Sequence, residues 1–173
     1  RRPPVCPVMR DMASAPAPSV SSAPATLSNA DILRGSVVSG IANAFINGAI
    51  QWFLLRGKAP IPLSVDGIAN DQHTVLGTAV PLAVSIAMIL TVVAYMTLKQ
   101  PKRAFMPHVL WLTLKHGIFT FGLVVAGAVV WQKFMGSVPV SLATAVVVLG
   151  VVAGIVGGVI NFMTIRASLL RAA

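Results

Sequence analysis

The sequence predicts an all-α integral membrane protein, a bundle of four transmembrane helices that follows a disordered N-terminal tail. Four apolar stretches, about residues 35–55, 75–98, 109–132 and 140–164, are each long enough for a helix to cross a bilayer. The chain is 56% hydrophobic and only 10% charged, whereas soluble domains carry about 25% charged residues. A chain so poor in charge lacks the side chains to cover a water-facing surface.

Ionisable residues lie almost entirely outside these stretches, with Lys115 and His116 as the exceptions. Hydrocarbon demands this distribution, since a charge at the bilayer centre costs at least about 2.5 kcal/mol. The formal charge of +9 would suggest nucleic acid as the partner of a soluble protein. Here the Lys and Arg residues gather at the ends of the stretches, so we interpret them as topology signals and expect no nucleic-acid partner.

Residues 1–30 are rich in Pro, Ala and Ser and lack an apolar run that could form the core of a signal peptide. We expect a disordered tail, followed by a transmembrane domain over residues 31–173. An organelle transit peptide is the alternative, because the tail is rich in Ser and poor in acids, although its prolines oppose an amphipathic helix. The single cysteine, Cys6, rules out an intrachain disulfide.

Lys and Arg in the connections predict the orientation. One side of the membrane receives Arg34, Lys99, Lys102, Arg103, Arg166 and Arg171, and the other receives Arg56, Lys58 and Lys133. The positive-inside rule then places both termini in the cytoplasm. We expect the bacterial inner membrane, with an organelle membrane as the alternative.

The first stretch carries the most specific pattern of the chain. Polar residues recur there at every fourth position: Ser39, Asn43, Asn47 and Gln51. This spacing places them on one helix face over about 18 Å, at 1.5 Å per residue. Because lipid would leave the amides without hydrogen bonds, the face must meet protein or water. The amides either hold the helix to its neighbours, at about 0.6–2 kcal/mol for each interaction, or line a polar path for a substrate.

Small residues mark two surfaces for close helix packing. In the first stretch a second ridge consists of Ser36, Gly40, Ala44 and Gly48. In the fourth stretch the same spacing is found for Gly150, Gly154 and Gly158, with Gly157 and Asn161 beside them. Such ridges let helices approach to near backbone contact. The spacing leaves open whether each ridge meets a helix of this chain or of another one.

Lys115 and His116 are expected about 10 Å inside the membrane, at 1.5 Å per residue from Val109. Asn43 enters from the same side to a similar depth, and Asn161 lies near that interface, so these four side chains could meet. An ionisable residue inside a membrane is by default a hypothesis of function, here proton transfer or anion binding. In the structural alternative, Lys115 extends its amine to the interface and His116 hydrogen-bonds to the amides.

Cofactor binding and catalysis have little support. His108 and His116 share one helix, so they cannot ligate opposite faces of one haem within a chain, and His73 lies at the other end of the bundle. The spacing of Asp66, Asp71 and His73 defines no metal geometry. All four acids lie outside the apolar stretches, and no arrangement typical of nucleophilic catalysis is found. We expect no cofactor, no metal and no enzymatic activity.

Short connections predict that helices consecutive in the chain are antiparallel neighbours in space. The halves of the chain show no inverted repeat, which argues against a stand-alone alternating-access transporter. Small multidrug transporters also have four spans, but this chain has amides where their first helix carries a carboxylate. Cation export by their mechanism is therefore disfavoured.

Three hypotheses follow. The leading one is a non-catalytic accessory or assembly subunit of a larger membrane complex, for instance respiratory or photosynthetic, with lipids and other transmembrane subunits as partners. The alternative is a small permease or channel, complete only as a homo-oligomer, that is lined by the polar face of its first helix. The third is an enzyme or cofactor-dependent protein centred on His116 and Lys115.

Overall fold

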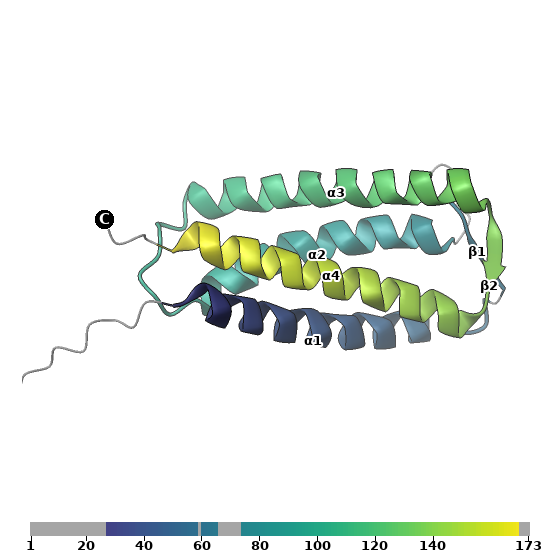
Figure 1. The fold of residues 1–173 in the computed structure, drawn as a ribbon, viewed down its shortest axis with the longest axis horizontal. Helices are drawn as coiled ribbons and strands as arrows, with labels where there is room; N and C mark the ends of the chain where they lie inside the picture. Colours follow the sequence, from purple (N-terminus) through teal and green to yellow (C-terminus); the bar gives the residue numbers. More distant parts are fainter. Residues whose placement is uncertain (1–26, 59, 66–73, 170–173) are drawn as a thin grey trace, which may run out of the picture.

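The computed structural model describes residues 27–58, 60–65 and 74–169. They form four helices, α1 (Asn29–Leu55), α2 (Val75–Thr97), α3 (His108–Met135) and α4 (Leu142–Ser168), and two short strands, β1 (Ile61–Leu63) and β2 (Val138–Val140). All four helices are long and apolar enough to cross a membrane. The strands lie at the end of the bundle opposite the start of α1 and the end of α4 (Figure 1). Most of the expected tail (residues 1–26, with Cys6) lies outside the described residues, as do Asp66, Asp71, His73 and Arg171.

Capping side chains fix where the helices start. The Ser28 hydroxyl accepts the Asp31 N–H (3.2 Å) and the Asp31 carboxylate accepts the Ser28 N–H (3.3 Å), a capping box that starts α1 at Asn29 rather than near residue 35. The hydroxyls of Thr74 and Ser141 cap α2 and α4. Because the residues just before Ser141 form β2, α4 begins at Leu142 and not at the predicted residue 140.

The helices are arranged in the order α1, α4, α2, α3. α1 packs on α4, α4 on α2 and α2 on α3, whereas α3 meets α4 only slightly and the described part of α1 has no comparable contact with α2 or α3. The prediction that consecutive helices are neighbours is therefore right for α2 and α3 and wrong for the other two pairs. The reason is the unexpected strand pair, which leads the chain away from α1 and from α3 before the next helix begins.

The strands pair antiparallel, with Pro62 opposite Pro139 at the centre and Ile61 opposite Val140. An antiparallel pair has a local two-fold axis through its centre. Since the halves of the chain share one element order, α1–β1–α2 and α3–β2–α4, this axis exchanges the α1–α4 contact with the α3–α2 contact. It returns the α2–α4 contact to itself.

Burial follows the same symmetry. In the first helix of each half, matching residues lie 77 positions apart, like the paired prolines. Three buried residues of α1, Ile32, Gly40 and Gln51, match three buried residues of α3, Val109, Gly117 and Ala128. In the second helices the spacing is 66, and Ala79, Ala83 and Ala87 match Ala145, Leu149 and Ala153, each at most 1% exposed. The halves thus share one element order and part of their buried pattern, and they run in the same direction, unlike the inverted repeat that the sequence lacks.

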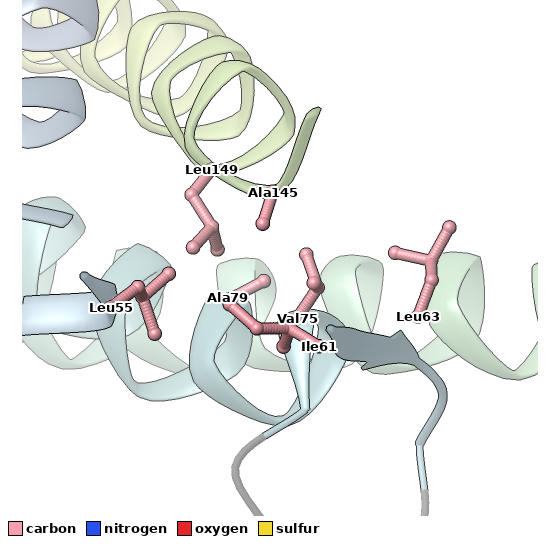
Figure 2. Close-up of a cluster of buried hydrophobic side chains, with 7 residues drawn as sticks. All are labelled: Leu55, Ile61, Leu63, Val75, Ala79, Ala145 and Leu149. Atoms are coloured by element: carbon pink, nitrogen blue, oxygen red, sulfur yellow. The ribbon is translucent and has the colours of Figure 1, made fainter. Parts of the chain in front are cut away.

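The apolar core lies between α2 and α4. One cluster closes the strand end of the bundle, where Leu55, Ile61 and Leu149 meet alanines of α2 and α4 (Figure 2). A second cluster continues between α2 and α4 through Ala87 and Ile160. Only 17% of the apolar segment of α1 is buried, against 39% in α2 and in α4. The central pair is therefore α2 and α4, and α1 and α3 flank it.

Candidate functional site

A buried polar cluster, hereafter the His116 cluster, lies where α2, α3 and α4 meet. His116 is 1% exposed, and its Nδ1 lies 2.9 Å from the Thr91 Oγ1 and 3.5 Å from the Thr164 Oγ1. The single hydroxyl proton of Thr91 is donated to the Ala87 carbonyl oxygen at 2.7 Å. Thr91 can therefore only accept from the histidine, which makes His116 Nδ1 the protonated ring nitrogen.

Further buried polar groups extend from this cluster toward the end of the bundle that holds the start of α1. Thr164 and Ser168 lie one turn apart on α4, and both are fully buried. Three buried atoms at this end have no hydrogen-bond partner within the described part of the chain: the Ser168 Oγ, the Thr113 Oγ1 and the His108 Nε2. Lys115 lies outside this set, since its side chain is exposed on the outer face of α3.

On the other side of the molecule, the polar ridge of α1 makes mostly local hydrogen bonds. The Asn43 amide nitrogen donates to the Ser39 carbonyl oxygen and the Asn47 amide nitrogen donates to the Asn43 carbonyl oxygen, each at 2.9 Å. Gln51 is 4% exposed, and its Oε1 has no partner among the residues that the structure describes. These side chains are thus largely held by their own helix.

Two contacts connect the polar residues of α1 with α4. The Asn161 amide nitrogen donates to the Ser36 hydroxyl oxygen at 3.2 Å. Asn43 covers Gly157 so closely that a Cβ atom at Gly157 would lie 3.0 Å from the Asn43 Cβ. Both contacts hold helices together.

The expected meeting of Asn43, Asn161, Lys115 and His116 is not found. Asn43 and Asn161 belong to the α1–α4 contact, while His116 is held by α2 and α4. The helix order explains this separation, because α1 and α3 flank the central pair on opposite sides. By the two-fold relation, Ser39 and Asn43 match His116 and Thr120, so the polar groups occupy equivalent places in the two halves.

The small residues of α1 face the glycines of α4 within this chain. A Cβ atom added at Gly40 would lie 2.7 Å from the Gly154 carbonyl oxygen. One at Gly150 would lie 3.1 Å from the Ala44 carbonyl oxygen, and one at Gly158 would lie 3.2 Å from the Ser36 carbonyl oxygen. Gly48 has more room, with Val146 at 3.9 Å. Four of these five glycines therefore approach the backbone of the opposite helix.

Sequence reasoning missed Thr91, Thr164 and Ser168. Each stands in a helix that reads as apolar, and a threonine or serine there can bond to its own helix, so its residue type alone gives no signal. The one available signal was a buried histidine that needed a partner. Within the described ranges, no three His, Cys, Asp or Glu side chains gather as a metal site would require.

Comparison of the chain with models of known protein families, with curated proteins and with solved structures found no match. Function must therefore be inferred from the chain's own contacts. Two features bear on it: the His116 cluster, whose polar groups are enclosed by three helices, and the polar ridge of α1, which is buried at Gln51 but only half buried at Ser39, Asn43 and Asn47.

Proposed function

We propose that this protein is an integral membrane protein and a non-catalytic accessory or assembly subunit of a larger membrane complex, with both termini on the cytoplasmic side. Its outer surface supports the membrane placement. Large apolar side chains are widely exposed on the flanking helices, for example Phe45 (77%) and Phe53 (64%) on α1 and Phe119 (51%) on α3. Apolar surface of this extent suits lipid or a protein partner and would cause aggregation in water.

One observation carries the subunit assignment: the open flank of α1. Asn47 is half buried at this flank, and Asn43, also half buried, lies at its edge with one side against Gly157 of α4. The amide nitrogens of both residues already donate to the α1 backbone. Their Oδ1 atoms accept no hydrogen bond from any described residue. Lipid tails have no donor to offer, and an unsatisfied polar group in hydrocarbon costs several kcal/mol. A neighbouring helix that brings donors to this flank satisfies both amides and makes the ridge an assembly surface.

Replacing Asn47 by Leu tests this assignment. Leu has a similar size but no acceptor, so we expect a partner protein to be lost or held more weakly while the chain itself remains folded. The measurement is mild detergent extraction of the tagged full chain from its native membrane, followed by native gel electrophoresis and mass spectrometry of everything that migrates with it. Ser85→Leu, at an exposed polar position of α2, is the matched control. A chain that migrates alone contradicts the assignment.

An oligomeric permease or channel is the second candidate, and Asn47 favours it. This side chain is half buried, and its Oδ1 accepts no hydrogen bond from any described residue. In a homo-oligomer, Asn47 and the half-buried Ser39 of the same ridge would face a water-filled path. This candidate predicts that Asn47→Leu abolishes flux in proteoliposomes and leaves assembly intact. Unaltered flux together with the loss of a partner rejects it.

A further inference from the structure

An apolar groove runs along the outer side of the α1–α4 contact. Its first part has a volume of about 540 Å³ and its second part about 450 Å³, and the two parts adjoin at Ala44 and Val151, which line both. Glycines of the two helices form the floor, and exposed side chains such as Val37 and Ile155 form the walls. The groove therefore opens outward, to the surface that faces the bilayer in the proposed orientation.

The groove at the α1–α4 contact is larger than the cavity at the equivalent α2–α3 contact. At the equivalent place between α2 and α3 the cavity is smaller, about 240 Å³, and Met88 lines it where the other half has Gly154. The Met88 side chain also lies against Gly117, where an added Cβ atom would be 3.2 Å from its Cγ. At the α2–α3 contact the Met88 side chain fills the space that remains open beside Gly154 at the α1–α4 contact.

Two arginines mark the end of the groove near the termini. Arg34 lies three and seven residues before Val37 and Ile41 and so shares their helix face. Arg166 lies one turn beyond Phe162, which also lines the groove. Both side chains are exposed. Both arginines are thus placed just beyond the lining residues, at the same end of the apolar groove.

The acid at this end does not neutralise the pair through the groove. Asp31 lies three residues before Arg34 and so neighbours it on α1, but no ion pair joins these two side chains in the described part of the chain. Its carboxylate is also used in the capping box with Ser28. With two arginines against this one acid, the mouth of the groove keeps a net positive charge, which suits a phosphate.

We propose that this groove binds one acyl chain of an anionic phospholipid whose phosphate is held by Arg34 and Arg166. An acyl chain is apolar and flexible and extends along the helices, and the headgroup lies at the membrane depth where the arginines stand. The bound lipid supports the side of α1 that no other helix of the described chain covers. This inference rests on the proposed placement of the helices in a bilayer.

Native mass spectrometry of the purified full chain tests the headgroup. The chain is held in a mild non-ionic detergent and mixed with equal amounts of dioleoyl phosphatidylglycerol and dioleoyl phosphatidylcholine. We expect one phosphatidylglycerol to be retained with a preference of about tenfold, a factor that corresponds to about 1.4 kcal/mol. Arg34→Gln with Arg166→Gln should remove the preference, and Lys99→Gln, an exposed lysine of the α2–α3 connection, should keep it. Equal retention of the two lipids by the unaltered chain overturns the proposal.

A groove-filling variant tests the acyl chain. Ile155→Trp places a large ring at the exposed wall, where it blocks the trough without entering the α1–α4 contact, and should reduce phosphatidylglycerol retention at least about fivefold. Ile89→Trp, on the exposed face of α2, is the matched control. Unchanged phosphatidylglycerol retention in Ile155→Trp rejects the lipid site.

These assays use the isolated chain, so they are separate from the partner assay of the proposed function. A chain that binds a partner protein through Asn47 but shows no lipid preference rejects this inference alone. A chain that selects phosphatidylglycerol but migrates without a partner keeps the lipid site and rejects the accessory-subunit assignment.

Discussion

His116 and the asparagines of α1 satisfy their polar atoms in different ways. Asn43 and Asn47 donate to carbonyl oxygens one turn earlier on their own helix, so these bonds form whatever lies next to α1. His116 instead depends on threonines of two other helices, Thr91 and Thr164. The local bonds are compatible with an open flank, whereas the histidine bond requires that α2, α3 and α4 be assembled.

Replacing Thr91 by Val tests this dependence. The substitution keeps the shape but removes the acceptor of the His116 Nδ1–H, and a buried donor without a partner costs about 1–3 kcal/mol. We expect the free energy of unfolding, measured by detergent-matched denaturant titration, to fall by that amount. Thr97→Val is the control, because Thr97 also donates to a carbonyl oxygen of α2 but is exposed. Its expected change is within about 0.5 kcal/mol. Equal losses in the two variants contradict the role of the histidine bond.

Residue type and spacing were enough to single out the polar ridge and His116, because amides and an imidazole inside apolar stretches need an explanation wherever they lie. Their partners could not be read in the same way. Thr91 lies 25 residues before His116 and Thr164 lies 48 residues after it. Which of these contacts forms depends on the order of the helices around the bundle, and residue spacing along one helix carries no information on that order.

The α1–α4 contact is the element that most depends on glycine. Backbone atoms of the two helices approach each other at Gly40, Gly150 and Gly158, so side-chain adjustment cannot relieve an added methyl group there. Gly48 lies on the same ridge but faces only the Val146 side chain, at an ordinary distance. The small-residue ridge of α1 therefore requires glycine at Gly40 but has room for a methyl group at Gly48.

Gly40→Ala and Gly48→Ala should consequently change stability in opposite directions. At Gly40 the new methyl group would lie 2.7 Å from the Gly154 carbonyl oxygen, and overpacking of this kind costs about 1–3 kcal/mol. At Gly48 the methyl group fits, and Ala favours a helix over Gly by up to about 1 kcal/mol. The check is the unfolding free energy of both variants, with hydrogen exchange to show that the Gly40→Ala loss is concentrated in α1 and α4. Equal effects at both sites would show that α1 and α4 do not meet along this ridge.

The apolar stretches were enough to predict that four helices exist, but they predicted the helix boundaries only in part. The capping box of Ser28 and Asp31 makes α1 start earlier than predicted. The strand before Ser141 makes α4 start later than predicted. The strand pair itself was not predictable, because each strand has only three residues and pairs with a strand far away in the sequence, Pro62 with Pro139. Without that pair, short connections suggest neighbouring helices, which is the prediction that proved wrong.

At the scale of the whole molecule, the main helix contacts all join one half of the chain to the other. α1 packs on α4, α2 on α3, and α2 on α4, while the two helices within each half make little contact. Neither half alone therefore buries a helix–helix interface of its own. The two-fold arrangement makes the chain equivalent to a dimer of helix–strand–helix units whose members are linked through the α2–α3 connection.

This arrangement predicts that the protein can be divided without losing its structure. If the chain is cut between Lys99 and Gln100 and both pieces are produced in the same cell, they should associate one to one, because every principal helix contact and the β1–β2 pair crosses the division. Each piece produced alone lacks those contacts and should be degraded or aggregate. Co-purification through a tag on one piece measures the association. Gly40→Ala in the first piece should weaken it and Gly48→Ala should not, because of these two changes only the methyl group added at Gly40 would meet the α4 backbone. Pieces that are stable alone and fail to associate would mean that each half folds on itself, contrary to the α1–α4 contact.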